Sequence, residues 1–141
     1  MSHIAESVEV SVPVEDAYRE WSRFTAFPEF MHGIEEVAAA PGATVHWVAG
    51  VDGVRREFDT EVTERVPGER IAWRSVAGVE HSGVVTFHAL ETGRSRVMLQ
   101  IDHTPHGVLD AVGDWLGFIA HEVQRCLRDF KQHVEGRAVA H

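Results

Sequence analysis

The sequence predicts an α+β fold in which a curved antiparallel sheet of seven strands packs against one long C-terminal helix. Three observations predict it: an alternating strand near the start, strand-like segments separated by turns over residues 35–103, and a helical apolar stripe within residues 106–136. The 141 residues contain no repeat, low-complexity tract or linker. We therefore expect one domain over residues 1–141.

The first third of the chain predicts a strand and two short helices. Val8, Val10 and Val12 alternate with polar residues, which is the period of a half-buried strand. Over residues 14–24 apolar side chains recur at helical spacing, and two acidic residues stand where a helix N-terminus favours negative charge. Residues 26–34 combine large apolar side chains with a proline and a glycine, so we expect a second, shorter helix or turn.

The middle of the chain predicts an antiparallel meander, because short turns join its strand-like segments. We expect six strands near residues 35–40, 43–50, 54–65, 70–76, 80–89 and 95–103. The closing segment carries one apolar stripe at the helical period: Leu109, Val112, Leu116, Ile119, Val123, Leu127, Phe130 and Val134. Only the sheet is large enough to bury that stripe. A curled sheet need not close tightly on a helix, so the sequence predicts a cavity between them.

Composition excludes several classes of function. With 44% hydrophobic and 25% charged residues the chain has the balance of a soluble globular protein, and it has neither a signal-peptide pattern nor a membrane-span pattern. The net charge of -9 opposes binding to nucleic acid or to an anionic membrane surface. The single cysteine, Cys126, agrees with a reducing compartment, so we expect a cytoplasmic protein. No phosphate-binding loop or metal-ligand motif appears, and we expect no cofactor and no metal.

Four segments carry a resemblance to a known family: "VSVPVEDAYREWSRFTAFPEFMHGIEEV", "VTERVPGERIAWRS", "GVVTFHAL" and "GRSRVMLQID". Over about residues 5–135, the chain resembles the polyketide cyclase/dehydrase and lipid-transport-like group of the START/Bet v 1-like (SRPBCC) superfamily. The resemblance implies a helix-grip fold with a hydrophobic ligand between sheet and helix. It leaves the activity open, because that superfamily includes aromatase/cyclases, coenzyme Q carriers, lipid carriers and hormone receptors.

Strand alternation predicts which side chains face the cavity. If Trp73 points inward, side chains at every second position of the neighbouring strands share its face. The predicted ligand-binding residues are Trp47, Arg56, Phe58, Thr60, Trp73, Ser75, His81, Val85, Phe87 and Leu116. Apolar walls with a few polar groups are the expected composition of a small-molecule site. The alternative is that the aromatic residues fill an ordinary core against the helix.

Two arginines distinguish a binding protein from an enzyme. By the resemblance, Arg65 in "TERV" matches the pocket arginine of aromatase/cyclases, which is thought to orient the polyketide and assist proton transfer. Alternation predicts the reverse: with Phe58 and Val62 inward, Arg56 points into the cavity and Arg65 points to solvent unless a β-bulge intervenes. The candidate catalytic residues are therefore Arg56, Arg65 and His81.

Binding of a hydrophobic, aromatic or polyketide-like small molecule is the function that we expect. An aromatase/cyclase, in which Arg56 or Arg65 would work with His81 on an enolate, is one alternative, and a lipid or quinone carrier is another. A structural protein whose own side chains fill the cavity is a third. Phe118 falls on the polar side of the long helix and is compatible with a homodimer contact, a lid over the cavity or an ordinary exposed side chain.

Overall fold

The fold is described from a computed structural model of the chain. It describes residues 2–31, 33–40, 44–51, 54–77, 81–103 and 123–136. Within these ranges only the backbone is described for six residues: Ser2, Ala40, Val51, Val54, Arg56 and His103. The predicted helix therefore enters the description at residue 123. Leu116 and Phe118 lie outside the described residues.

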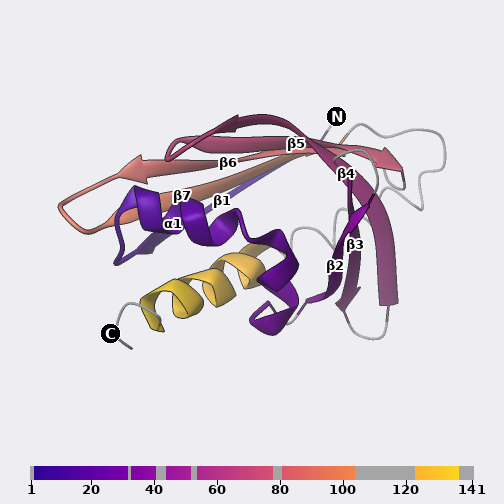
Figure 1. The fold of residues 1–141 in the computed structure, drawn as a ribbon, viewed down its shortest axis with the longest axis horizontal. Coiled ribbons are helices and arrows are strands. Elements are labelled where there is room, and N and C mark those ends of the chain that lie inside the picture. Colours follow the sequence, from indigo (N-terminus) through magenta and orange to yellow (C-terminus); the bar gives the residue numbers. More distant parts are fainter. Residues whose placement is uncertain are drawn as a thin grey trace.

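Seven strands form one antiparallel sheet in the order β1–β7–β6–β5–β4–β3–β2. Their bounds are β1 Ser2–Val10, β2 Ile34–Ala40, β3 Thr44–Val51, β4 Val54–Val66, β5 Arg70–Ala77, β6 His81–Ala89 and β7 Ser95–His103. Strands β2 to β7 form a meander in chain order, and β1 pairs with β7. The sheet is strongly curled, and β4 bends from the layer of β5 down toward β3 and β2 (Figure 1). The sequence predicted all seven strands.

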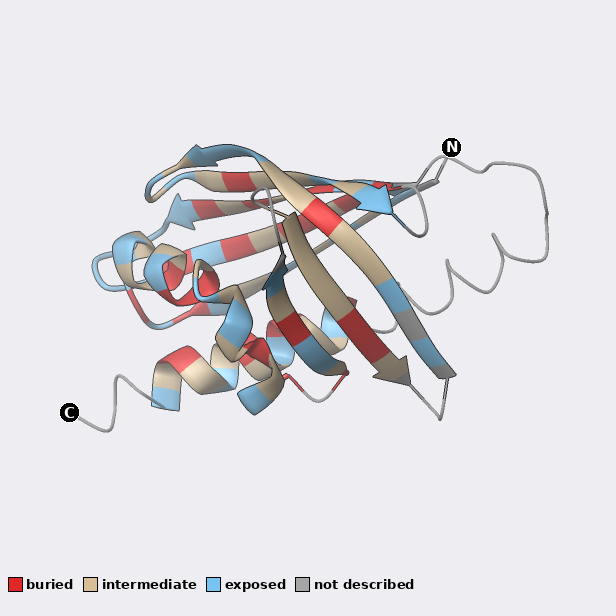
Figure 2. Ribbon diagram, turned by 45° about the vertical axis from the view of Figure 1, so that its right-hand side comes forward, coloured by how far each residue is buried: buried red, intermediate tan, exposed pale blue. Residues whose placement is uncertain are grey.

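One face of the sheet is buried and the other meets solvent. On β6, His81, Gly83, Val85 and Phe87 are buried, whereas Ser82 is exposed. The same alternation recurs on β7, and buried segments interrupt exposed ones along the strands (Figure 2). We call the buried side the concave face, because the helices lie against it.

Two short helical elements and the C-terminal helix cover the concave face. Helix α1 is Val14–Trp21, and the 3-10 helix η1 is Phe24–Glu29. The C-terminal helix, described over residues 123–136, lies on the same side of the sheet as α1 (Figure 1). Four side chains at helical spacing are buried along it: Val123, Leu127, Phe130 and Val134. The predicted apolar stripe is confirmed over the described part of this helix.

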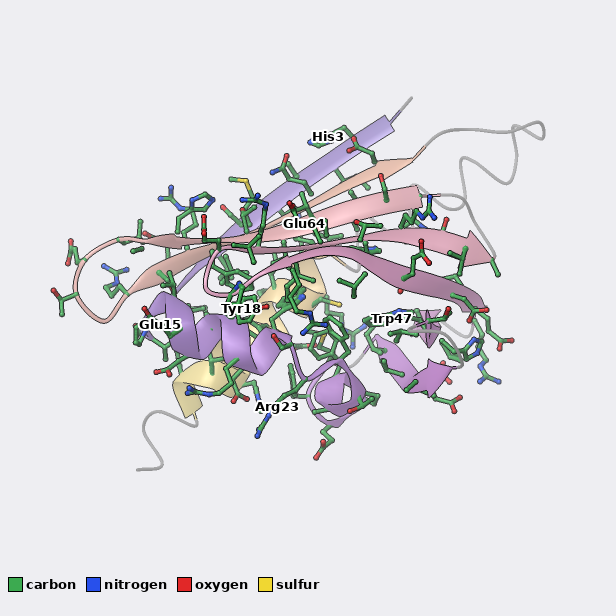
Figure 3. The ribbon with its side chains drawn as sticks, turned by 45° about the horizontal axis from the view of Figure 1, so that its top comes forward. His3, Glu15, Tyr18, Arg23, Trp47 and Glu64 are labelled. Atoms are coloured by element: carbon green, nitrogen blue, oxygen red, sulfur yellow. The ribbon has the colours of Figure 1, made fainter. Side chains whose placement is uncertain are left out.

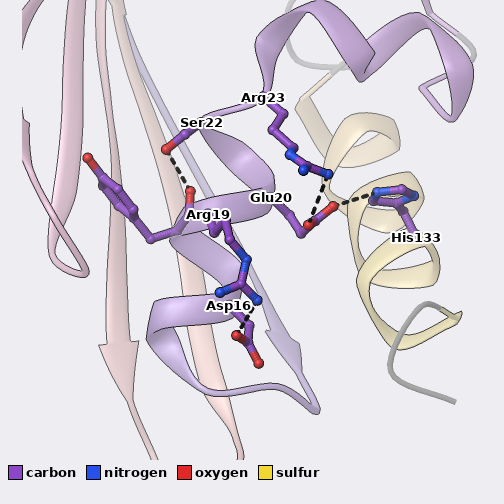
Figure 4. Close-up of polar contacts among 7 residues, drawn as sticks. Asp16, Arg19, Glu20, Ser22, Arg23 and His133 are labelled. Carbon is purple, nitrogen blue, oxygen red and sulfur yellow. Dashed lines mark hydrogen bonds and ion pairs between the residues drawn. The ribbon is translucent and has the colours of Figure 1, made fainter. Parts of the chain in front are cut away.

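A buried carboxylate connects α1 to the C-terminal helix. Glu20 Oε1 lies 3.0 Å from His133 Nε2, and Arg23 Nη1 lies 3.8 Å from Glu20 Oε2 (Figure 4). The His133 ring stacks on Phe30 with centroids 3.8 Å apart. Phe130 completes this contact, with its ring 4.9 Å from that of Trp21. The end of the helix is thus held by charge, stacking and apolar packing together.

The turn between β4 and β5 follows its sequence signals. Gly68 has φ 75°, which a residue without Cβ adopts at no steric cost. The Glu69 N–H donates to the Val66 carbonyl at 3.0 Å, and Pro67 fixes the torsion before the glycine.

Within the described part of the chain, no helix combines the length and the apolar character that a membrane span requires.

β4 contains an irregularity that alternation alone does not predict. Val62 pairs with Trp73 and Glu64 pairs with Ala72, so Thr63 is an extra residue without a partner on β5. Beyond this β-bulge Arg65 pairs with Ile71, which is a fully buried residue of the concave face. The bulge therefore moves Arg65 to the face opposite the one that alternation predicts.

The last turn of the C-terminal helix is fastened to the start of the chain through Glu135. Its Oε2 accepts hydrogen bonds from Lys131 Nζ at 2.8 Å and from the Ser11 N–H at 3.0 Å. Burial alone would raise the pKa of Glu135, but these two donors outweigh burial and hold the pKa below its ordinary value. The charged carboxylate is thus the form that the fold prefers.

We predict that Glu135 makes folding stability depend on pH in the acid range. A carboxylate with a lowered folded-state pKa stabilises the fold above the unfolded pKa of about 4.3, and this contribution is lost as the pH falls through the folded-state pKa. Between about pH 6 and pH 3, the free energy of unfolding in urea should fall less in Glu135→Gln than in wild type. Glu29→Gln, a change at an exposed glutamate, is the control and should match wild type. Equal pH dependence in Glu135→Gln and wild type would contradict this role.

Candidate ligand-binding cavity

A cavity lies between the concave face, η1 and the C-terminal helix. The volume open to a water-sized sphere inside it is about 120 Å³, and the empty space reaches about 870 Å³ only when the open solvent at its mouth is counted. Six aromatic side chains line it: Trp21, Phe24, Phe27, Trp47, Phe58 and Trp73. Aliphatic side chains complete most of the remaining wall, among them Met31, Val62, Ile71, Leu99 and Ile101. The walls are therefore almost entirely apolar.

Trp47 is at the centre of the aromatic wall. It is paired across β3 and β4 with Phe58, and the two rings lie nearly parallel with centroids 6.1 Å apart. From the other side, Phe24 and Phe27 of η1 approach Trp47 with centroids 6.0 and 5.9 Å away. Trp47 lies on the side of the sheet that the helices cover, as Tyr18 of α1 does (Figure 3).

Thr60 is one of the few polar groups in the cavity. Its Oγ1 accepts a hydrogen bond from Trp47 Nε1 at 2.9 Å, and the threonine is only 3% exposed. The indole N–H is thereby satisfied inside an apolar wall. A hydroxyl that accepts one hydrogen bond still has a proton of its own to donate. Thr60 can therefore present a donor to a ligand oxygen.

His81 contributes an imidazole ring to the cavity wall. It is 6% exposed, and its ring lies edge to face with Phe58 at a centroid distance of 5.2 Å. Its backbone N–H donates to Ser75 Oγ at 2.9 Å, so the serine oxygen accepts a hydrogen bond from the sheet. The imidazole of His81 can donate a hydrogen bond from one ring nitrogen and accept one at the other.

Trp73 lies flat against the sheet because its partner on β6 has no side chain. Trp73 pairs with Gly83, and a Cβ at position 83 would lie 2.3 Å from Trp73 Cζ2. Real Cβ contacts are essentially never that short. The indole thus occupies the space of the missing side chain.

Five of the predicted ligand-binding residues line the cavity: Trp47, Phe58, Thr60, Trp73 and His81. Their ligand-binding role stays a prediction. The side chain of Arg56 is outside the described part of the structure, although its backbone pairs with Ala49, which lines the cavity. Leu116 lies outside the described residues as well.

Three other predicted ligand-binding residues are inward but have other surroundings, and their ligand-binding role stays a prediction. Val85 is fully buried in the core, and Phe87 packs edge to face on Tyr18 of α1 at 5.6 Å. Ser75 holds the backbone of His81. None of the three is among the described lining residues. Helix α1 covers the part of the concave face to which Phe87 belongs.

Arg65 combines the two opposite expectations. It is exposed, as alternation predicted, yet the bulge at Thr63 places it on the concave face, as the resemblance implied. Its guanidinium carbon lies 5.8 Å from the centroid of Phe24, within the range of a cation–π contact. Because Phe24 lines the cavity, Arg65 stands at the edge of that wall.

Sequence reasoning missed the lining residues of the first helices. Trp21, Phe24, Phe27 and Met31 all contribute to the cavity. The apolar side chains of residues 14–24 and 26–34 were the available signal, but spacing along the chain does not say against which part of the sheet they pack. Cys126 of the C-terminal helix also lines the cavity.

The charged groups with shifted pKa values on the sheet lie outside the cavity. His46 on β3 lies 2.6 Å from Asp59 and 3.3 Å from Glu57, and the hydrogen bond with Asp59 raises the pKa of His46 above its ordinary 6.5. On the same outer face the hydrogen bond from Arg70 lowers the pKa of Glu64. Among the described residues, no three His, Cys, Asp or Glu side chains form a group that could hold a metal ion.

A curled seven-stranded sheet that encloses an apolar cavity with a C-terminal helix is the helix-grip architecture of START-like proteins. The chain belongs to the polyketide cyclase/dehydrase and lipid transport family, whose model matches residues 10–131. The fold class and the family expected from the sequence are thereby confirmed.

The chain is similar to a relative in sequence and to solved structures in fold. The chain is 46% identical to the uncharacterized 17.2 kDa protein in the melC2–rnhH intergenic region of Streptomyces lincolnensis, over 97% of this chain and 92% of that protein. Among solved structures, the Zhui aromatase/cyclase from Streptomyces sp. R1128 matches with a TM-score of 0.80 at 16% identity, covering 97% and 95% of the two chains. A START superfamily protein from Mycobacterium smegmatis matches with a TM-score of 0.70 at 16% identity, covering 96% and 95%.

We predict that Thr60 is the acceptor that holds the Trp47 indole in the wall. Thr60→Val keeps the shape but leaves a buried N–H without its acceptor, which should cost about 1–3 kcal/mol in the free energy of unfolding. Hydrogen exchange of the Trp47 Nε1–H, followed by NMR, should accelerate by about tenfold as the bond is lost. Thr60→Ser keeps the oxygen and should leave this exchange rate close to that of wild type. An unchanged exchange rate in Thr60→Val would show that the bond does not form.

Proposed function

We propose that this protein binds a hydrophobic, ring-containing small molecule in the cavity between the concave face and the C-terminal helix. The single observation that carries the proposal is the wall of six aromatic side chains around an almost wholly apolar space. Small-molecule sites have this composition, with a few polar groups that set the orientation of the ligand. Thr60 and His81 would supply that orientation at one part of the wall.

Thr60 on β4 and His81 on β6 both adjoin Ser75 of β5, the strand between them. Thr60 pairs with Ser75 across β4 and β5, and the backbone N–H of His81 bonds to the Ser75 hydroxyl. A ligand oxygen placed there would meet a hydroxyl donor and an imidazole. The remaining contacts would be apolar, so affinity would come mainly from buried area and ring stacking.

We include cytoplasmic residence and a single domain over residues 1–141 in the proposal.

A cyclase is the second candidate, and the position of Arg65 favours it. The bulge brings this arginine to the cavity side, and a protein of similar fold is an aromatase/cyclase. Arg65 pairs with Ile71, however, whereas His81 lies beside Ser75, four positions further along β5. The two backbones are offset by roughly 13 Å along the strands, at about 3.3 Å per residue, and by two strand spacings, roughly 10 Å, across the sheet. The pair would therefore act on different parts of a long ligand, and not on one enolate atom.

Occupancy of the cavity can be measured through Cys126, because it is the single cysteine of the chain and lines the wall. N-phenyl-1-naphthylamine, a neutral aromatic probe, should slow alkylation of Cys126 by N-ethylmaleimide. At ten times its Kd the probe leaves about a tenth of the protein free, so the rate should fall about tenfold. Native mass spectrometry of the same sample should show one bound probe. An unchanged alkylation rate without bound probe would overturn the proposal.

Arg65 separates binding from catalysis, with Arg74 as a matched control that pairs with Glu61 on the outer face. We expect Arg65→Ala to weaken 2-naphthoate binding by about 1–2 kcal/mol, the scale of one charge-assisted hydrogen bond, and Arg74→Ala to leave it unchanged.

Wild type should bind a linear poly-β-carbonyl thioester without speeding its cyclisation. Cyclisation by wild type that Arg65→Ala abolishes and Arg74→Ala retains would replace the binding proposal with the cyclase.

A further inference from the structure

We propose that Gly83 sets the breadth of the cavity by leaving room for the Trp73 indole, and so selects flat, fused-ring ligands over slender chains. This inference rests on the proposed binding function and goes beyond it by naming a specificity-determining residue. Gly83 itself contributes no side chain to the wall. It acts through the position of Trp73, which does line the cavity.

The backbone does not require a glycine at position 83. Among the described glycines, Gly68 and Gly93 have positive φ, and Gly83 does not. It lies within a regular stretch of β6, paired with Trp73 on one side and with Ile101 on the other. A residue with a Cβ suits such a position, since glycine weakens a strand interior. The reason for glycine therefore lies in the space above it.

That space is filled by the face of the indole. A Cβ at position 83 would lie 2.3 Å from Trp73 Cζ2 and 2.7 Å from both neighbouring ring atoms, Cε2 and Cη2. Cε2 and Cη2 are both bonded to Cζ2, and both are equally far from this Cβ and only slightly farther than Cζ2 is. The line from the Cβ to Cζ2 is therefore nearly perpendicular to the plane of the ring. One face of the indole thus rests on the sheet. The other face is turned to the cavity.

A flat platform favours a flat ligand. Aromatic rings gain attraction beyond their buried area in offset-stacked arrangements, which need an open ring face and room for a second ring. Any side chain at position 83 would lift the indole from the sheet into the cavity, because the contact at 2.3 Å cannot persist. The loss of room would exclude a fused ring first. A slender chain needs less breadth and no open ring face.

The test compares two fluorescent probes on purified variants. N-phenyl-1-naphthylamine carries a fused ring, and cis-parinaric acid is a slender polyene chain. Gly83→Ala should weaken binding of the naphthyl probe by about tenfold or more, the scale of one extra methyl group in a close-packed site, and binding of parinaric acid by less than about threefold. Ser82→Ala, on the exposed face of the same strand, is the control and should change neither affinity.

A second variant keeps the inference testable if Gly83→Ala folds poorly. Gly83→Ala combined with Trp73→Val removes the clash, and should recover part of the naphthyl affinity lost in Gly83→Ala. Trp73→Val alone removes the flat indole face and leaves the breadth of the cavity in place. It should weaken binding of the naphthyl probe more than binding of parinaric acid.

Each failure has a distinct reading. Equal losses of both probes in Gly83→Ala, or no loss of either, would overturn the role of Gly83 while leaving the proposed function in place. Equal losses of both probes in Trp73→Val would overturn the platform. Failure of wild type to bind either probe would overturn the proposed function itself, and this inference with it.

Discussion

The structure depends on how a curled sheet buries its concave face. The covering elements are few: α1 and η1 from the start of the chain, and the C-terminal helix from its end. Buried apolar residues of that helix, Phe130 above all, meet α1 as well as the sheet, so the cover is one packed unit. A helix follows a straight line and the sheet does not. Where the two separate, aromatic side chains surround an open space.

Most of the fold could be predicted from the sequence because the strands are regular. Alternation assigned Trp47, Phe58 and Trp73 to the concave face, and the structure places all three in the cavity wall. Alternation does not say which element covers a given part of that face. Phe87 has the same parity, yet α1 lies over it and its ring packs on Tyr18. The position of α1 is a tertiary property, and a periodic pattern within one strand carries no information about it.

Strand alternation could not predict the side of Arg65, for a different reason. Thr63 has neither a glycine nor a proline beside it, so the local sequence gives no signal of a bulge. The bulge follows from two registers that do not agree: Val62 opposite Trp73, and the short turn that ends at Arg70. One residue must remain unpaired between them. That requirement becomes visible only when both strands are placed together.

The bulge also bears on how sequences of this family are compared. Removing Thr63 would leave Val62, Glu64 and Arg65 opposite Trp73, Ala72 and Ile71 in an unbroken ladder, with each side chain on its present face. One residue can therefore be inserted or removed between the half of β4 that forms the cavity wall and the half that carries the arginine, and the side chains of both halves stay on the same faces of the sheet. A one-residue gap at this point of an alignment between two homologues does not by itself indicate that their arginines lie on different sides of the sheet.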